Sequence, residues 1–314
     1  MRDVHPGRSV TAHSPPRNRL AALLTALMLP LLLLACDSPK KEHYTPSYTS
    51  TPTAQQTVLI FGVHPLHNPQ RLFETYGPLV EYLNRNFPDI TIQLEASRSY
   101  AEFDKKLYSR HFHFALPNPY QTLNSLQHGY RIFAKMGEDD KFRGIIIARK
   151  DSGITRVADL KGKTVSFPAP TALAATMMPL YFLHTHGLDV NKEIKRLFSG
   201  SQESSIMNVY LGKSAAGATW PPPWQAFQER NPKMAAELEV KWESSPLPNN
   251  GLVARDDVPP EVVAKMRSLL ISLHTHEEGR SLLATLPLAR FENATEATYQ
   301  PVRDFLKIYS ASVH

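Results

Sequence analysis

The segment that most constrains the fold is residues 157–179, where a short strand runs into the start of a helix. Residues 164–167 are rich in β-formers, and two prolines end this strand. Thr171 then precedes small and unbranched side chains that favour helix. Backbone N–H groups at a helix start lack internal partners and favour anions. The segment indicates an α/β fold with a ligand at this strand end. The alternative is an ordinary connection with Thr171 as a structural N-cap.

The same strand, loop and helix order repeats along most of the chain. The apolar run 57–63 is typical of a strand buried on both faces, and apolar residues at helical spacing follow it. Further strands are expected at 90–94, 112–116, 131–136, 143–149, 164–167, 195–198, 215–219, 239–242 and 252–255. Further helices are expected at 100–107, 119–127, 172–184, 203–211, 259–273, 281–286 and 299–309. This order predicts mixed, mostly parallel sheets with helices on both faces.

The alternation divides into two lobes. Residues 57–145 form the first part of lobe 1 and residues 146–244 form lobe 2. Residues 245–314 return to lobe 1 and supply the C-terminal helices. We expect the strands 239–242 and 252–255 both to return to the first lobe.

The first residues have the composition of an export signal. Four arginines precede an apolar run over residues 20–35, which is too short and too interrupted for a spanning helix. Residues 1–35 are therefore predicted to be a signal peptide, and the polar residues 36–56 a flexible tether. Cys36 ends a sequence, LLAC, that resembles the lipobox of bacterial lipoproteins, so we expect it to be lipidated. A buried free thiol is the alternative.

Without the predicted signal peptide, the net charge of the chain is too small to indicate a class of binding partner. Residues 1–35 carry four Arg and one Asp, so the formal charge of +6 falls to 6 − 3 = +3. No basic block with interleaved aromatic residues is present, and nucleic acid is not an expected partner.

Catalytic and metal-binding motifs are absent from the sequence. It has no G-x-S-x-G, phosphate loop or H-E-x-x-H, and no cysteine besides Cys36. The histidine pairs at 111/113, 184/186 and 274/276 have no acidic or thiol partner at ligand spacing. We expect no catalytic residue, no metal and no cofactor.

The candidate binding residues follow the predicted strands, whose carboxyl ends converge in doubly wound sheets. They are His64, Tyr100, Asn118, Tyr120, Thr171, Gln202, Ser204 and Trp220. Trp220 and Trp224 stand on a proline-rich loop and serve either as ligand contacts or as hydrophobic cover over lobe 2.

Several motifs, in this order, resemble one known family. They include FGVHPLHNPQRL, SYAEF, FALPNPY, DLKGKTVSF, SGSQESS and SSPLPNNGLVARDDVPP. The sequence is similar, from Val58 to Phe305, to the phosphate, phosphite and phosphonate substrate-binding proteins of ABC importers. This resemblance implies a type II periplasmic-binding fold, closure of two lobes about a hinge over a small-molecule solute, and an ABC permease as partner.

Departures from the family pattern concern the ligand site. Where the family has Ser-Thr-Ser-Gly at the helix start, this chain has residues 172–175, Ala-Leu-Ala-Ala. Gln202 replaces a frequent histidine, and Ala215 replaces an acidic residue. Each hydrogen bond to a charged ligand contributes about 1.5–3 kcal/mol, so their loss would weaken oxyanion binding by orders of magnitude. A weaker anion or a more apolar solute is expected.

We therefore expect a monomeric, lipid-anchored solute receptor on the periplasmic face of the cell envelope. Asp37 after Cys36 resembles an inner-membrane retention signal. One alternative is a sensory or interaction lipoprotein that signals its ligand state to a membrane partner. Another is an enzyme on the same fold, against which the signal peptide argues.

Overall fold

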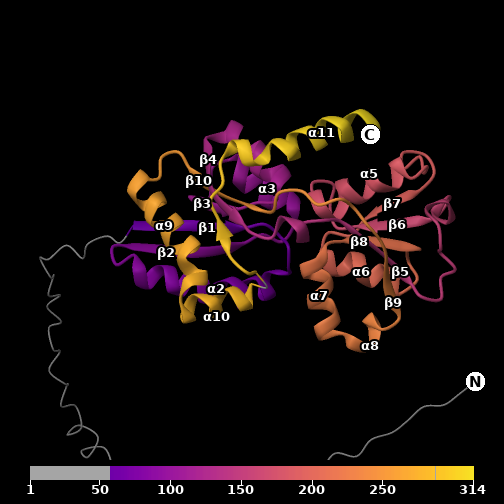
Figure 1. Cartoon of the computed structure of the whole chain (residues 1–314), viewed down its shortest axis with the longest axis horizontal. Coiled ribbons are helices and arrows are strands. Elements are labelled where there is room, and N and C mark those ends of the chain that lie inside the picture. Colours follow the sequence, from indigo (N-terminus) through magenta and orange to yellow (C-terminus); the bar gives the residue numbers. More distant parts are fainter. Residues whose placement is uncertain (1–56, 287) are drawn as a thin grey trace, which may run out of the picture. The chain divides into compact units, whose positions relative to one another are not determined.

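Two mixed β-sheets, each flanked by helices, organise the chain (Figure 1). The structure is a computed structural model that describes residues 57–286 and 288–314. The predicted signal peptide (1–35), the lipidation site Cys36, the retention residue Asp37 and the tether (36–56) lie outside the described residues.

The first lobe is built on a sheet with the strand order β11-β4-β10-β3-β1-β2. Its strands are β1 (Thr57–Val63), β2 (Ile90–Ala96), β3 (Phe114–Leu116), β4 (Tyr130–Met136), β10 (Gly251–Arg255) and β11 (Phe291–Glu292). β1 runs parallel to β2 and β3, whereas β10 is antiparallel to β3 and β4. The helices of this lobe are α2 (Pro69–Asn86), α3 (Tyr100–Tyr108), α4 (Pro119–Ser125), α9 (Pro260–Ser272) and α10 (Glu277–Thr285).

The second lobe is built on a sheet with the strand order β7-β6-β8-β5-β9. Its strands are β5 (Ile145–Arg149), β6 (Thr164–Phe167), β7 (Lys195–Phe198), β8 (Ala216–Thr219) and β9 (Leu238–Glu243). β6 is parallel to β7 and β8, and β5 is antiparallel to β8 and β9. The helices are α5 (Met178–Thr185), which follows a π-helical turn over Leu173–Met177, then α6 (Gln202–Tyr210), α7 (Pro221–Arg230) and α8 (Pro232–Ala235).

One strand lies in a different sheet from the one predicted. β9 was expected to return to the first lobe, but it pairs with β5 in the second sheet, from Ile145 opposite Glu243 to Arg149 opposite Leu238. Only β10 of the two expected strands returns to the first sheet. The alternation of apolar residues in β9 indicates a strand but carries no information about its neighbour.

Three segments connect the lobes. Residues 137–144 lead from β4 to β5, residues 244–250 lead from β9 to β10, and α11 (Gln300–Ser312) is the third. α11 buries Val302 in the first-lobe core, and Val313 just after it is buried in the second-lobe core. Arg196 Nη1 also donates to the His314 carbonyl at 2.9 Å. The C-terminal helix therefore straps one lobe to the other.

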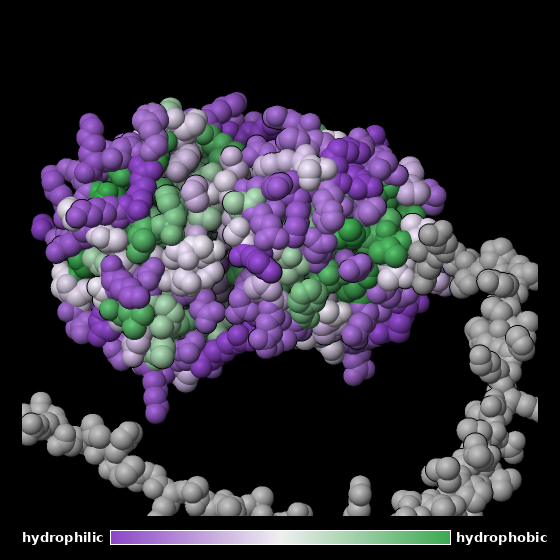
Figure 2. All heavy atoms as spheres, turned by 180° about the vertical axis from the view of Figure 1, so that it is seen from behind, coloured by the Kyte–Doolittle hydropathy of each residue, from purple (hydrophilic) through white to green (hydrophobic). Residues whose placement is uncertain are grey.

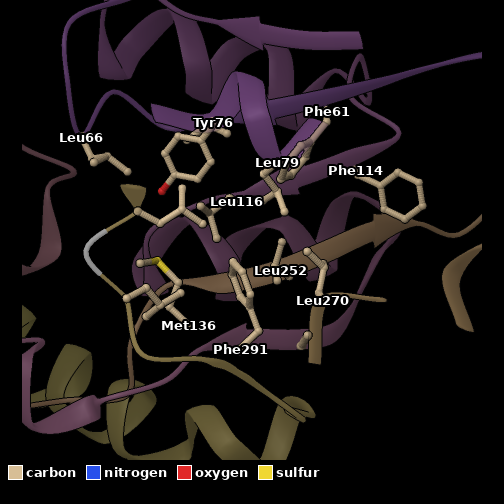
Figure 3. Close-up of a cluster of buried hydrophobic side chains, with 14 of the residues drawn as sticks. Phe61, Leu66, Tyr76, Leu79, Phe114, Leu116, Met136, Leu252, Leu270 and Phe291 are labelled. Atoms are coloured by element: carbon tan, nitrogen blue, oxygen red, sulfur yellow. The ribbon is translucent and has the colours of Figure 1, made fainter. Parts of the chain in front are cut away.

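The main hydrophobic core lies in the first lobe and continues into the second. Figure 3 shows side chains from β1, β3, β10 and α2 meeting at its centre, among them Phe61, Phe114, Leu252 and Leu79. Leu173 and Trp220 of the second lobe belong to the same buried cluster. The two lobes therefore meet through apolar contacts in this structure.

Side-chain caps fix where the helices begin beside this interface. The Asn118 side chain accepts from the Gln121 N–H, and the Gln121 side chain accepts from the Asn118 N–H, so α4 starts with a reciprocal capping box. Ser99 caps α3 and Ser201 caps α6 through the same kind of bond. Local sequence therefore places the first residues of α3, α4 and α6 where strands end.

Hydrophilic residues cover most of the face seen in Figure 2, with smaller hydrophobic areas between them. Within residues 57–286 and 288–314, no helix combines the length and the apolar character that crossing a membrane requires.

Candidate functional site

A small cavity lies where loops after the strands of both sheets meet between the lobes. It has a volume of about 10 Å³ and is lined by His64, Tyr100, Asn118, Phe142, Ala172, Leu173, Ala174, Ala175, Gln202, Trp220 and Asn250. A water molecule needs about 10–15 Å³ measured in this way. In the state that the structure describes, the cavity has room for about one water.

Hydrogen bonds join the lobes at this cavity. Gln202 Nε2 donates to the Tyr100 hydroxyl at 3.0 Å, and Gln202 Oε1 accepts from Thr219 Oγ1 at 2.9 Å. Asn118 Nδ2 donates to the Thr171 carbonyl at 2.9 Å. Tyr100, Gln202 and Asn118 are all buried. Buried polar groups that are paired in this way favour one relative position of the lobes.

His64 is an uncharged member of the cavity lining at neutral pH. Its Nδ1 lies 2.9 Å from the Leu116 carbonyl, and the side chain is 2% exposed. Burial lowers the pKa of His64 to about 4, although the bond to the Leu116 carbonyl partly opposes this shift. His64 therefore offers hydrogen bonding without a positive charge.

The turn that precedes α5 combines unpaired amides with hydrocarbon side chains. The N–H groups of Leu173, Ala174 and Ala175 have no acceptor within residues 57–286 and 288–314. Leu173 is fully buried, and the two alanines are nearly so. Gly144, on the first connection between the lobes, packs against this turn so closely that a Cβ there would overlap the Ala174 carbonyl oxygen. The backbone donors of an anion site remain, and the side chains of residues 172–175 carry no hydroxyl.

A carboxylate stands next to the same turn. Asp104 accepts from Thr171 Oγ1 at 3.1 Å and from Gln121 Nε2 at 2.6 Å. Burial raises the pKa of Asp104, and these two hydrogen bonds oppose the rise. The Thr171 hydroxyl is therefore already donated to a carboxylate, and the local field disfavours a second negative group.

Besides residues 172–175, two cavity residues were not among the candidates taken from the sequence. The Phe142 ring meets Trp220 edge to face, with ring centroids 5.4 Å apart. Asn250 is fully buried, and its Oδ1 has no hydrogen-bond partner among the described residues. The Asn249-Asn250 pair before β10 was the only available signal for these two residues, because asparagine side chains are mostly exposed and a buried pair next to a strand is uncommon.

The structure brings together five of the predicted residues, His64, Tyr100, Asn118, Gln202 and Trp220, in the cavity lining. The other three lie outside it. Thr171 contacts Asp104, and Ser204 belongs to the cap of α6 through Ser201. Tyr120 is partly buried against the first-lobe core. Trp224 stacks on Phe227 at 6.0 Å within the second lobe, where it serves as cover. Binding by any of these residues stays a prediction.

Metal ligation has no candidate among the described residues, because no group of three His, Cys, Asp or Glu side chains there is placed to hold an ion. The histidines 111, 184, 186 and 274 lie apart from the interlobe cavity. His111 instead pairs with Glu95 at 2.9 Å.

Comparison with protein families identifies the chain. Residues 61–299 match the profile of the ABC transporter, phosphonate, periplasmic substrate-binding protein family. The chain belongs to this family. The match covers well over half of the 314 residues and includes both sheets described above except the first four residues of β1. The resemblance seen in the sequence is confirmed, and members of this family bind solutes and are not enzymes.

Two curated members of the family show similarity at low identity. The probable ABC transporter phosphite binding protein PhnD1 of Prochlorococcus marinus (strain MIT 9301) is 23% identical over 197 residues, which are 59% of this chain and 65% of that protein. The phosphate-import protein PhnD of Mycolicibacterium smegmatis is 21% identical over 259 residues, covering 78% of this chain and 79% of that one. The chain thus spans slightly less than two thirds of the first relative.

Solved structures share the fold. A binding protein component of an ABC phosphonate transporter from Pseudomonas aeruginosa has a TM-score of 0.75 at 20% identity, over 82% of this chain and 88% of that one. PhnD1 from Prochlorococcus marinus in complex with methylphosphonate has a TM-score of 0.74 at 18% identity, over 81% and 99%. The fold is therefore that of the type II periplasmic binding proteins, as predicted.

Proposed function

We propose that this family member is the lipid-anchored solute-binding component of an ABC importer, and that its ligand is a small polar molecule with little negative charge. The observation that carries this proposal is the uncharged cavity between the lobes. Its lining contains no Lys, Arg, Asp or Glu, and His64 is neutral. Unpaired donors at residues 173–175 and an unpaired acceptor on Asn250 are available to a ligand.

A phosphonate dianion fits this lining poorly. Three hydroxyl donors, which the family resemblance implies for the turn before α5, are replaced by Ala172, Leu173 and Ala174. Each lost hydrogen bond to a charged ligand costs about 1.5–3 kcal/mol, and the loss of two weakens binding by roughly 10²–10⁴-fold. The Asp104 carboxylate adds repulsion at the same place.

Entry of a ligand requires the lobes to separate about the connections 137–144 and 244–250. We propose that the described state is the closed one, because the cavity between the lobes has a volume of only about 10 Å³, which leaves room for about one water. Tyr100 of the first lobe and Gln202 of the second, which bond directly to each other in the described state, are the ligand contacts that closure would bring together.

The binding test is a titration of the purified chain, followed by calorimetry. Neutral polar solutes and zwitterions form one arm, and methylphosphonate, phosphite and phosphate form the other. We expect binding in the first arm that Tyr100→Phe weakens, and affinity at least 100-fold lower in the second arm. Native mass spectrometry of gently purified protein provides an independent check. Submicromolar binding of methylphosphonate, or a co-purified oxyanion within the cavity, would refute the proposed ligand class.

The membrane anchor is tested separately. We propose that residues 1–35 are removed, that Cys36 is acylated and that the body stays on the periplasmic face, with Asp37 retaining it at the inner membrane. Radiolabelled palmitate should label the wild-type chain but not Cys36→Ser, and the variant should leave the membrane fraction. Unchanged fractionation of Cys36→Ser would contradict the anchor.

The apolar contact between the lobes favours a second candidate, a sensory or interaction lipoprotein. Leu173 is entirely buried in the core that the lobes share, and this contact stabilises the closed state. On this hypothesis the closed chain itself binds a membrane partner. Absence of binding to every solute, combined with a permease-independent membrane partner captured by crosslinking, would favour this candidate over import.

A further inference from the structure

A second cavity lies between the lobes, beside α2, α6 and α7. Its volume is about 40 Å³, enough for about three waters. The polar residues in its lining that matter here are His67, Asn68, Arg71, Glu203, Arg230 and Asn231. We call it the Arg71 pocket. It shares only Gln202 with the cavity described above.

Arg71 is the least satisfied charged group in this pocket. Its Nε is buried and has no hydrogen-bond partner, and its guanidinium makes no ion pair within the described residues. Arg230 faces the same space from the end of α7, and its only ion pair there is with Glu74 at 3.1 Å. A guanidinium presents five donors in a planar fork, so an unpaired one requires an acceptor.

The surrounding backbone adds further donors. α2 begins at Pro69 after its cap Asn68, and α6 begins at Gln202 after its cap Ser201, so two helix N-termini border the pocket. The positive charges of the two arginines affect the protonation of His67. Burial is the main cause that lowers the pKa of His67 to about 3, and the charges of Arg71, His64 and Arg230 contribute in the same direction. His67 is therefore neutral and adds no charge of its own.

Glu203 is an acidic residue of the pocket, and its negative charge opposes the binding of an anion. It lines the pocket, and its Oε2 accepts only a long bond of 3.4 Å from Asn68 Nδ2. Glu203 forms no ion pair with Arg71 or Arg230 among the described residues. Its carboxylate therefore reduces the affinity for an anion without neutralising Arg71.

We propose that the Arg71 pocket binds a dissolved oxyanion, which bridges Arg71 of the first lobe and Arg230 of the second. A tetrahedral ion such as sulfate or phosphate has the size of a few waters and accepts hydrogen bonds on all sides. It pairs with the fork of Arg71, and it stabilises the closed arrangement because its ligands come from both lobes. This site is separate from the uncharged cavity and does not depend on the solute proposed there.

Inorganic sulfate is the probe, titrated into the purified chain by calorimetry at low ionic strength. We expect saturable binding of one ion per chain. Arg71→Gln should weaken it about 10-fold or more, because a charge-assisted bond is lost. Glu203→Gln should strengthen it several-fold by removing like charge. Arg280→Gln is the matched control, since Arg280 is exposed on α10 without an ion pair among the described residues, and it should leave binding unchanged.

Three results of the sulfate titrations would overturn the proposal. They are no saturable sulfate binding by the wild-type chain, equal weakening by Arg71→Gln and Arg280→Gln, and weaker binding by Glu203→Gln. Anionic vesicles test the other source of the same chemistry, a lipid headgroup. Vesicle binding by the Cys36→Ser chain that requires Arg71 would also overturn the assignment to a dissolved ion. None of these results bears on solute binding, which Tyr100→Phe reports.

Discussion

The role of Leu173 in closing the lobes can be tested by truncating it to alanine. Leu173 is 0% exposed and belongs to the core shared by both lobes. Leu173→Ala removes three carbon atoms from this contact, each contributing about 0.8 kcal/mol on burial, or about 2.4 kcal/mol together. In the proposed hinge motion the lobes separate without unfolding, so this loss acts on the closed state. The opening equilibrium constant should rise about 50-fold.

Thiol labelling measures this constant. A cysteine at Ala174, which is 4% exposed, becomes accessible only when the lobes separate, provided Cys36 is replaced by serine. When reclosing is faster than the thiol reaction, the labelling rate is proportional to the opening constant. We therefore expect labelling about 50 times faster in Leu173→Ala than in the parent chain.

Leu183→Ala is the matched control. Leu183 is also 0% exposed and lies in α5, but it packs within the second-lobe core. The cavity that Leu183→Ala leaves lies inside the second lobe and persists when the lobes open. The free energy of unfolding should therefore fall by about 2–5 kcal/mol. Labelling at position 174 should change little. Equal labelling rates in the two variants, with the expected loss of stability in Leu183→Ala, would refute the role of Leu173 as a closing contact.

Three further predictions concern protonation, the hydrogen bond between the lobes and the strap. Because burial lowers the pKa of His64 from 6.5 to about 4, the unfolded chain binds more protons between these values. The free energy of unfolding should therefore decrease by about 3 kcal/mol as the pH drops from 6.5 to 4. Urea unfolding at the two pH values measures this decrease, which should be smaller in His64→Gln. Tyr100→Phe removes the acceptor of Gln202 Nε2, so a loss of about 1 kcal/mol should raise the opening constant about 5-fold in the labelling assay; an unchanged rate would assign Tyr100 to packing alone. Val313→Ala removes two carbons, about 1.6 kcal/mol, from the second-lobe core. Amide exchange over residues 309–314 should therefore accelerate about 10-fold in Val313→Ala. Ile308→Ala is the control and should have little effect, because Ile308 is 48% exposed. Equal effects of the two substitutions would contradict the role of α11 as a strap between the lobes.

Local sequence determined the elements and their order. Apolar periodicity predicted β1, α2 and β2, because burial on a face repeats with the geometry of the backbone itself. The starts of α3, α4 and α6 follow from the side chains of Ser99, Asn118 and Ser201, each of which caps amides within three residues. The family could be recognised for the same reason, since its motifs are short and contiguous.

Only the tertiary structure decided which of these elements meet. β9 pairs with β5 rather than with the first sheet, and nothing in its own alternation specifies a partner. Asp104 reaches Thr171 across 67 positions of sequence, and Phe142 and Asn250 enter the cavity lining from the two connections between the lobes. In the sequence, Leu173 could be recognised only as the replacement of a hydroxyl side chain that the family pattern has at this position. That it fills the space between the lobes depends on side chains from both sheets closing around it, which no local pattern encodes.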